Sequence, residues 1–296
     1  MKIVLITNPH AGGHKSQQLI PMVKKCLRAN KIAFDLFLTL HSDHVDEIIR
    51  SIKLQEYDAL VAMGGDGANY HLLNAVLKHH DQARLPPLGI IPAGRGNSFA
   101  RDLNLFSPED AIDAISRRRT RPVDVCRFTQ NTNIYYFVNC MGMGFVTDVA
   151  RTATRFRRTG HFSYIIGVWH RMYNLNFYNL RMEIDGTLVS GSNCLVEICN
   201  SRYTGGEMLM APEAKIDDGL FDAVILEPFS RLNLLVTLPK LFKGTHVDHP
   251  RIRVIQGKTA TICTKPEKKL LPDGEMFGVT PTHLTMLPRR VRYFCR

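Results

Sequence analysis

The stretch Ala59-Leu60-Val61-Ala62-Met63-Gly64-Gly65-Asp66-Gly67 decides the fold of the first half of this chain. Its five apolar residues predict a buried strand, and apolar residues at helical spacing from Leu72 to Leu77 predict a helix directly after the glycines. A glycine turn between a strand and a helix lets backbone N–H groups approach an anion at the positive helix end. The stretch therefore predicts one unit of a parallel α/β sheet that carries an anion site.

Strand and helix signals alternate on both sides of this stretch. Apolar runs at Ile3–Ile6, Ile32–Leu38 and Leu88–Ile91 predict three more strands separated by helices, which is typical of a parallel sheet covered on both faces. After about residue 125, short strands dominate, and 251–263 has the two-residue alternation of half-buried antiparallel strands. We expect an α/β domain over 1–125 and a β-rich domain over 126–282, interrupted by helices near 162–177 and 230–242.

Composition limits the partner and the compartment. The 296 residues carry a formal net charge of +11, which indicates an anionic partner: nucleic acid, a phosphate-bearing ligand or an anionic membrane surface. The seven cysteines are scattered without a CxxC pair, which favours reduced thiols. No signal peptide and no apolar run of about 20 residues is present, so a soluble, cytoplasmic protein is expected.

Two further glycine-containing loops follow predicted strands. They are Asn8–Gly13 after the first strand and Gly94–Ser98 after the fourth. In an open parallel sheet, loops that follow strands lie at the same carboxyl edge, where such folds bind ligands. The spacing of a Walker P-loop fails around Lys15, and no GxGxxG follows the first strand. We interpret the three loops as a phosphate site; the alternative is tight turns with helix caps, with Asn97 or Ser98 as the cap.

Carboxylates accompany the loops. Asp66 lies among glycines that face a phosphate, a position that suits a cation between them or a proton transfer. Asp273 and Glu275 would point to one side if their segment were extended, whereas Asp273-Gly274 is more often a hairpin turn. The segment 212–220 is either a turn or a hard-cation site with one carboxylate and backbone carbonyls.

The chain resembles the lipid kinases that share the diacylglycerol kinase catalytic fold, which include bacterial YegS-like enzymes and sphingosine kinases. The matching residues run in order through nearly the whole chain: Asn8-Pro9, Gly64–Gly67, Gly94–Phe99, Pro122-Val123-Asp124, Phe137-Val138-Asn139, Gly142, Gly144, Gly205-Gly206, Ala214–Asp222, Gly244-Thr245-His246 and Asp273-Gly274-Glu275. The resemblance implies an N-terminal α/β nucleotide domain and a C-terminal β-sandwich-like domain. It also implies that a final strand, at 283–287 or 291–295, returns to the first domain.

The resemblance implies roles for individual residues. The expected ATP-binding residues are Asn8, Pro9, Thr39, Gly64, Gly65, Asp66, Gly67, Ala68, Gly94, Arg95, Gly96, Asn97 and Arg157. The expected catalytic residues are Glu275 as the general base, Asp66 as the alternative base and Asp273 beside them. A structural Mg²⁺ is expected at Asp218 and the carbonyls of Lys215 and Leu220, and Asp124 is expected at a separate catalytic metal.

The chain departs from the family pattern near the glycine loops. Ala68 replaces a usual Thr, Tyr70-His71 replaces Asn-Glu, Arg95 replaces a small hydroxyl residue and Ser98 replaces a frequent Asp. Without that Asp, Asp66 and Asp124 are left to hold the catalytic metal, and Arg95 is expected to contact phosphate. The segment 156–160 resembles the basic segment of sphingosine kinases, which favours a long-chain base or an atypical lipid as the substrate.

The positive charge is clustered, and one aromatic helix adjoins it. The clusters are Arg117–Arg119 with Arg121, Arg155 with Arg157 and Arg158, Lys265 with Lys268 and Lys269, and Arg289 with Arg290 and Arg292. They are either solvated faces or contacts with anionic lipid headgroups. Phe162, Ile166 and Trp169 are the expected lipid-binding residues; the alternative is a core helix.

Together these patterns predict an ATP- and Mg²⁺-dependent lipid kinase that acts on a membrane lipid and contacts the membrane peripherally. The alternatives are an NAD kinase, which shares the Gly-Gly-Asp-Gly turn, and an inactive lipid-binding homologue. The acidic turns argue against nucleic acid as a partner. A homodimer is left open.

Overall fold

The computed structural model describes residues 1–10, 13, 15–41, 43–80, 85–155, 167 and 175–296, and of residues 153–155 only the backbone. The chain divides into two compact units. The first comprises Met1–Val125, Tyr136–Val138 and Pro288–Arg296, and the second comprises Cys126–Tyr135 and Asn139–Leu287. All seven cysteines are free. No helix among the described residues is long and apolar enough to cross a membrane.

The first unit contains a parallel sheet with the strand order β2-β1-β3-β4-β17, and β5 pairs with β17. Its strands are β1 (Lys2–Thr7), β2 (Ala33–Leu38), β3 (Ala59–Gly64), β4 (Leu88–Pro92), β5 (Thr120–Gln130) and β17 (Thr282–Phe294). Its helices are α1 (Lys15–Ala29), α2 (His44–Ser51), η1 (Leu54–Glu56), α3 (Asp66–His80), α4 (Ser98–Asp102) and α5 (Pro108–Ser116). The strand order reverses at β1, because β2 lies on one side of it and β3 on the other.

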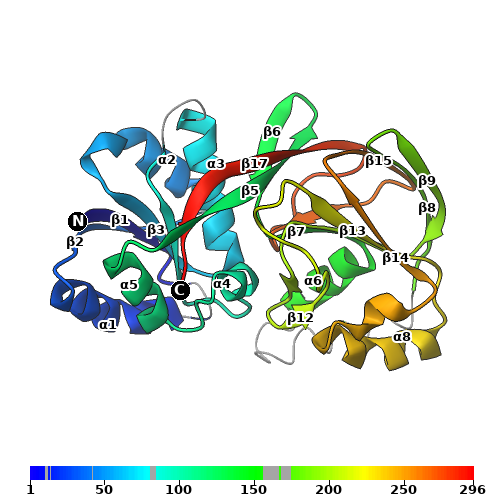
Figure 1. Ribbon diagram of the computed structural model, residues 1–296, viewed down its shortest axis with the longest axis horizontal. Helices are drawn as coiled ribbons and strands as arrows, with labels where there is room; N and C mark the ends of the chain where they lie inside the picture. Colours follow the sequence, from blue (N-terminus) through cyan, green and yellow to red (C-terminus); the bar gives the residue numbers. More distant parts are fainter. Residues whose placement is uncertain (11–12, 14, 42, 81–84, 156–166, 168–174) are drawn as a thin grey trace. The chain divides into compact units, whose positions relative to one another are not determined.

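Helices cover both faces of this sheet. Helices α2 and α3 pack together on one face, and α1 packs with α5 on the other (Figure 1). Strands β3 and β4 are buried along their whole length, as expected for central parallel strands. The predicted parallel α/β sheet is confirmed.

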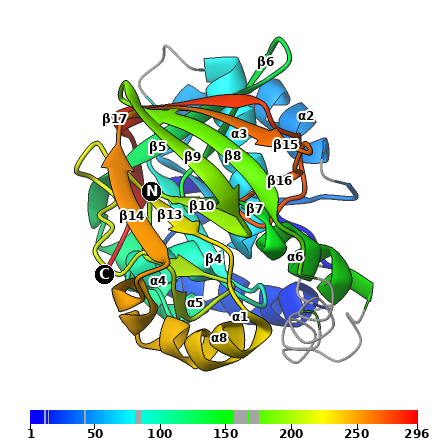
Figure 2. The ribbon, with the colours of Figure 1, turned by 90° about the vertical axis from the view of Figure 1, so that its right-hand side faces the viewer.

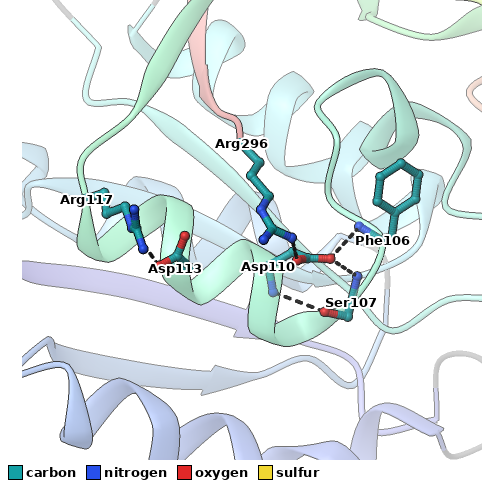
Figure 3. A network of polar contacts seen from close by, with 6 residues as sticks. All are labelled: Phe106, Ser107, Asp110, Asp113, Arg117 and Arg296. Carbon is teal, nitrogen blue, oxygen red and sulfur yellow. Dashed lines mark hydrogen bonds and ion pairs between the residues drawn. The ribbon is translucent and has the colours of Figure 1, made fainter.

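The C-terminal end of the chain is fixed to helix α5. Ser107 and Asp110 form a capping box: the Ser107 hydroxyl accepts the Asp110 N–H at 3.1 Å, and the Asp110 carboxylate accepts the Ser107 N–H at 3.1 Å (Figure 3). The Arg296 guanidinium donates to the other oxygen of Asp110. A cap of this kind satisfies N–H groups that an α-helix leaves without a partner inside the helix.

The second unit contains antiparallel strands in the orders β17-β15-β8-β9 and β14-β13-β10-β7-β16 (Figure 2), together with the two-stranded sheet β11-β12. Its further strands are β6 (Asn133–Phe137, paired with β5), β7 (Cys140–Gly144), β8 (Tyr178–Ile184), β9 (Thr187–Asn193), β10 (Leu195–Cys199), β11 (Tyr203–Thr204), β12 (Met208–Leu209), β13 (Phe221–Leu226), β14 (Ile252–Gly257), β15 (Thr259–Lys265) and β16 (Leu270–Pro272). Its helices include α6 (Phe145–Arg155), α8 (Arg231–Thr237), η3 (Leu238–Phe242) and η4 (Thr245–Asp248).

The structure refines two expectations about elements. The C-terminal segment forms one continuous strand, β17, instead of a strand at either 283–287 or 291–295. The helix expected at 230–242 is divided into α8 and η3, because Pro239 in the first turn of η3 supplies no N–H for an α-helical hydrogen bond. The helix expected near 162–177 lies almost entirely outside the described residues.

Candidate functional site

The three glycine loops meet at the carboxyl edge of the parallel sheet in the first unit. A Cβ atom on Gly94 would lie 2.4 Å from the Cα atom of Gly65, so the second and third loops touch through their backbones. The Arg95 side chain reaches the first loop, with its guanidinium 3.5 Å from the position of a Cβ on Gly13. The prediction that these loops share one edge is confirmed, and this edge includes the point where the strand order reverses.

Asp66 connects two of the loops. Its two carboxylate oxygens accept the backbone N–H groups of Ser98 and Phe99, each at 3.0 Å, and thereby cap helix α4. Asn97 precedes that helix with a φ of 56°, but its side-chain oxygen accepts the Gly94 N–H at 3.0 Å instead. Burial raises the pKa of Asp66, and the two backbone N–H bonds act in the opposite direction. The capping role considered for Asn97 or Ser98 thus belongs to Asp66.

The remaining predicted nucleotide residues of the first unit lie at the ends of neighbouring strands. Thr39, which is buried, donates its N–H to the Thr7 carbonyl at 2.9 Å. The Asn8 side chain accepts the His10 N–H at 2.8 Å, which fixes the start of the first loop. Of the predicted ATP-binding residues, Arg157 lies outside the described residues.

Asp124 is fully buried on β5. Its Oδ1 atom accepts the Arg289 N–H at 2.6 Å, and Arg289 has a φ of 50°. The carboxylate therefore holds a strained residue of the neighbouring strand β17. The metal-binding role of Asp124 stays a prediction.

In the second unit, the acidic segment after β16 is a tight turn. The Glu275 N–H donates to the Pro272 carbonyl at 2.8 Å, and Asp273 and Gly274 have φ values of 46° and 84°. The hairpin-turn interpretation is confirmed, and the extended arrangement of Asp273 and Glu275 is wrong because Asp-Gly takes the positive φ angles of this turn.

Two neighbouring backbone groups hold the buried Asp273 carboxylate. Its Oδ1 atom accepts the N–H groups of Asn139 at 2.9 Å and Cys140 at 3.2 Å. Glu275, two residues further on, is half-buried. Asp273 thus fixes the turn, and Glu275 follows on the fixed backbone.

The predicted cation segment also lies in the second unit. Asp218 closes a turn by accepting the Leu220 N–H at 3.0 Å. The pKa of the nearby Asp222 is raised to about 6, mainly by burial and also by the charges of Asp218 and Glu213, whereas a hydrogen bond with Gln256 acts in the opposite direction. A hard cation takes carboxylate and carbonyl oxygens as ligands, and Asp218 is the carboxylate that the sequence predicts for this role. Among the described residues, no three His, Cys, Asp or Glu side chains form a metal cluster.

An apolar cavity lies against the second sheet of the second unit. Its walls come from β10, β12, β13, β14, the start of α6 and the α8–η3 segment, and they include Phe145, Val146, Leu195, Val224, Leu234 and Leu241. The expected lipid-binding residues Phe162, Ile166 and Trp169 lie outside the described residues. Local sequence patterns do not predict this cavity, because residues spread between Phe145 and Ile252 form it.

Glu197 is a buried carboxyl group beside this cavity. It lies two residues after Leu195 on β10, and therefore on the same face of the strand. It also pairs across the sheet with Val224, and both Leu195 and Val224 line the cavity. The Oε1 atom accepts the Thr204 hydroxyl at 2.7 Å, and Oε2 has no hydrogen-bond partner among the described residues. Burial raises the pKa of Glu197 to about 7. The sequence contains a sign of this buried carboxyl group, because Glu197 is the one acidic residue in the apolar run Cys194–Cys199.

His246 contributes a second polar group to the cavity wall. The ring is buried, and its Nε2 atom lies 3.0 Å from the Met210 carbonyl, so Nε2 carries the proton. Burial lowers the pKa of His246. The ring is therefore held in the cavity wall by its hydrogen bond to the Met210 carbonyl.

These features define a two-unit protein with three glycine loops at a sheet edge in one unit and an apolar cavity in the other. Two family models match the chain: the diacylglycerol kinase catalytic domain over residues 2–128 and the YegS C-terminal NAD kinase beta sandwich-like domain over residues 139–295. The chain belongs to this family of lipid kinases.

Two relatives agree with this assignment, and a solved structure shows the same fold. A diacylglycerol kinase of Staphylococcus haemolyticus is 30% identical over 97% of this chain and 86% of its own length. A diacylglycerol kinase of Staphylococcus saprophyticus is 28% identical over 98% of this chain and 94% of its own. A crystal structure named as a diacylglycerol kinase of Bacillus anthracis superposes with a TM-score of 0.71 at 20% identity, over 100% of this chain and 97% of that one. The structural likeness bears on the fold alone.

Proposed function

We propose that this protein is an ATP-dependent lipid kinase that transfers the γ-phosphate of ATP to a hydroxyl group of diacylglycerol, a sphingoid base or a related lipid. The observation that carries the proposal is the meeting of three glycine loops at one sheet edge in a member of this family. The apolar cavity of the second unit supports a substrate with a hydrocarbon chain.

The glycine loops suit the phosphates of ATP. Gly65 and Gly94 approach each other closely because neither has a side chain, and this leaves backbone N–H groups near the start of helix α3. Arg95 is exposed beside the first loop, where its guanidinium can pair with phosphate oxygens. Asn8, Thr39 and Asn97 complete the loops that would surround the nucleotide.

We assign the general base to Glu275. Both oxygens of Asp66 already accept backbone N–H bonds, whereas Glu275 is half-buried on a turn that Asp273 fixes. Glu275 would take the proton of the lipid hydroxyl, whose oxygen attacks the γ-phosphorus; the bond from that phosphorus to the bridging oxygen breaks, and ADP leaves.

Mg²⁺ would neutralise charge that develops on the phosphate oxygens during transfer. Asp218 with the carbonyls of Lys215 and Leu220 would hold a structural ion, and Asp66 and Asp124 are the carboxylates of the first unit that would hold a catalytic one. The turn in which Asp218 accepts the Leu220 N–H at 3.0 Å supports the first of these sites, because it brings the carboxylate close to the Leu220 backbone. The basic clusters of the chain would place the enzyme on an anionic membrane surface.

The test is incubation of the protein with ATP, Mg²⁺ and, separately, diacylglycerol, sphingosine, ceramide and phosphatidylglycerol. A phosphorylated product from at least one lipid is expected, and Glu275→Gln should abolish it. Glu267→Gln is the matched control, because Glu267 is an exposed glutamate outside the turn. The absence of a phosphorylated lipid in every reaction would contradict the proposal.

The same preparation tests the two alternatives. Formation of NADP from NAD and ATP would identify an NAD kinase, and the Gly-Gly-Asp-Gly turn is the feature that keeps this option open. Vesicle binding without turnover of any lipid would identify an inactive lipid-binding homologue. This alternative is considered because the chain departs from the family pattern at Ala68, His71, Arg95 and Ser98.

A further inference from the structure

The segment formed by α8 and η3 has one side toward the apolar cavity of the second unit. Leu234, Leu238 and Leu241 line the cavity from this segment. The segment therefore lies between the cavity and the outer surface of its unit.

The other side of this segment exposes large apolar side chains. Leu232 is 69% exposed, Val236 59% and Phe242 55%. Leu232 and Val236 are four residues apart on one helix, so they lie on the same helical face. Three large apolar side chains are thus exposed within eleven residues, on a segment from which other side chains line the cavity.

The charges around this patch have one sign. Between Pro228 and Val247 the sequence contains Arg231, Lys240 and Lys243 and no aspartate or glutamate. Lys240 and Lys243 are exposed, and neither forms an ion pair with a described residue. An apolar patch with adjacent lysines complements a membrane surface, where apolar side chains enter the acyl boundary and ammonium groups meet anionic headgroups.

We propose that Leu232, Val236, Phe242, Lys240 and Lys243 form a docking face that binds an anionic lipid bilayer. The face differs from the arginine clusters of the sequence, because it combines exposed apolar groups with charge on one short segment. It rests on the proposed function, in which the bilayer is the source of the lipid substrate. The segment that would touch the bilayer also lines the cavity. A lipid chain would then have a short path from the bilayer to the cavity.

The experiment measures sedimentation of the full chain with phosphatidylcholine vesicles that contain 30% phosphatidylglycerol, without ATP. Leu232→Ser/Val236→Ser/Phe242→Ser should weaken binding at least tenfold, because it removes the apolar contact. Lys240→Gln/Lys243→Gln should weaken it by about fivefold for each lysine at low salt, and much less at high salt. Phe106→Ser/Ile134→Ser/Leu188→Ser is the matched control, because these side chains are 63%, 49% and 55% exposed on other elements, and it should bind like the wild type.

Circular dichroism of each variant establishes that it is folded before binding is measured. Wild-type affinity in the triple serine variant, or no binding of the wild type to these vesicles, would overturn the docking face. A dimer in size exclusion that the triple serine variant lacks, without vesicle binding, would show instead that the face binds a second copy. Because no turnover is measured, failure of the docking face and failure of the kinase proposal are distinguishable.

Discussion

The substitution Glu197→Gln should remove a specific pH dependence from the stability of this protein. Glu197 is 2% exposed, and burial raises its pKa from 4.5 to about 7. Below pH 4.5 the carboxyl is protonated in both the folded and the unfolded chain. Between pH 4.5 and 7 the unfolded chain releases this proton and the folded chain retains it, so the free energy of unfolding falls as the pH rises and then levels off.

The size of this effect follows from the two pKa values. At about 1.4 kcal/mol for each unit of pKa, the difference between 4.5 and 7 corresponds to about 3 kcal/mol. Glutamine keeps an oxygen for the Thr204 hydroxyl and cannot ionise. The variant should therefore have a stability close to that of the wild type at pH 4.5 and should be more stable by about 3 kcal/mol at pH 8.

Urea unfolding followed by circular dichroism from pH 4.5 to 8 measures this difference. The difference between variant and wild type isolates Glu197 from other acids such as Asp222, whose pKa of about 6 affects both proteins equally. Glu183→Gln on the exposed side of β8 is the matched control and should show no such trend. A difference between Glu197→Gln and wild type that stays constant across this range would refute the reasoning.

Three further predictions concern the two candidate sites. Gly94→Ala should destabilise the first unit by more than about 2 kcal/mol and abolish nucleotide binding, since the new Cβ would lie 2.4 Å from the Gly65 Cα. Urea unfolding measures the loss of stability and nucleotide titration the loss of binding, and an unchanged urea midpoint would contradict the prediction. Asp66→Asn should lower the free energy of unfolding in urea by about 1–3 kcal/mol, because one of the two backbone N–H groups at the start of α4 loses its acceptor. A free energy of unfolding equal to that of the wild type would show that this helix cap contributes nothing. Val224→Phe should fill the cavity and raise KM for the lipid without changing KM for ATP; equal changes in both would argue against a hydrocarbon in the cavity.

Local sequence patterns determined much of this fold. Continuous apolar runs such as Ala59–Met63 mark parallel strands that are buried on both faces, and two-residue alternation marks strands such as β15 that are buried on one face. Turn chemistry is local as well, so Asp273-Gly274 could be assigned to a hairpin turn from two residues. The shared edge of the three glycine loops followed from the parallel sheet, because parallel strands end on the same side.

Tertiary structure alone decided which groups meet across long stretches of sequence. Asp66 caps a helix that begins 32 residues later, and Asp273 holds N–H groups more than 130 residues earlier, so neither hydrogen bond has a sequence signature. The cavity, the burial of Glu197 and the exposed side of α8–η3 depend on which strands pair and which faces they cover. The sequence carries local conformation and patterning, whereas contacts, burial and pKa shifts arise only when distant segments pack together.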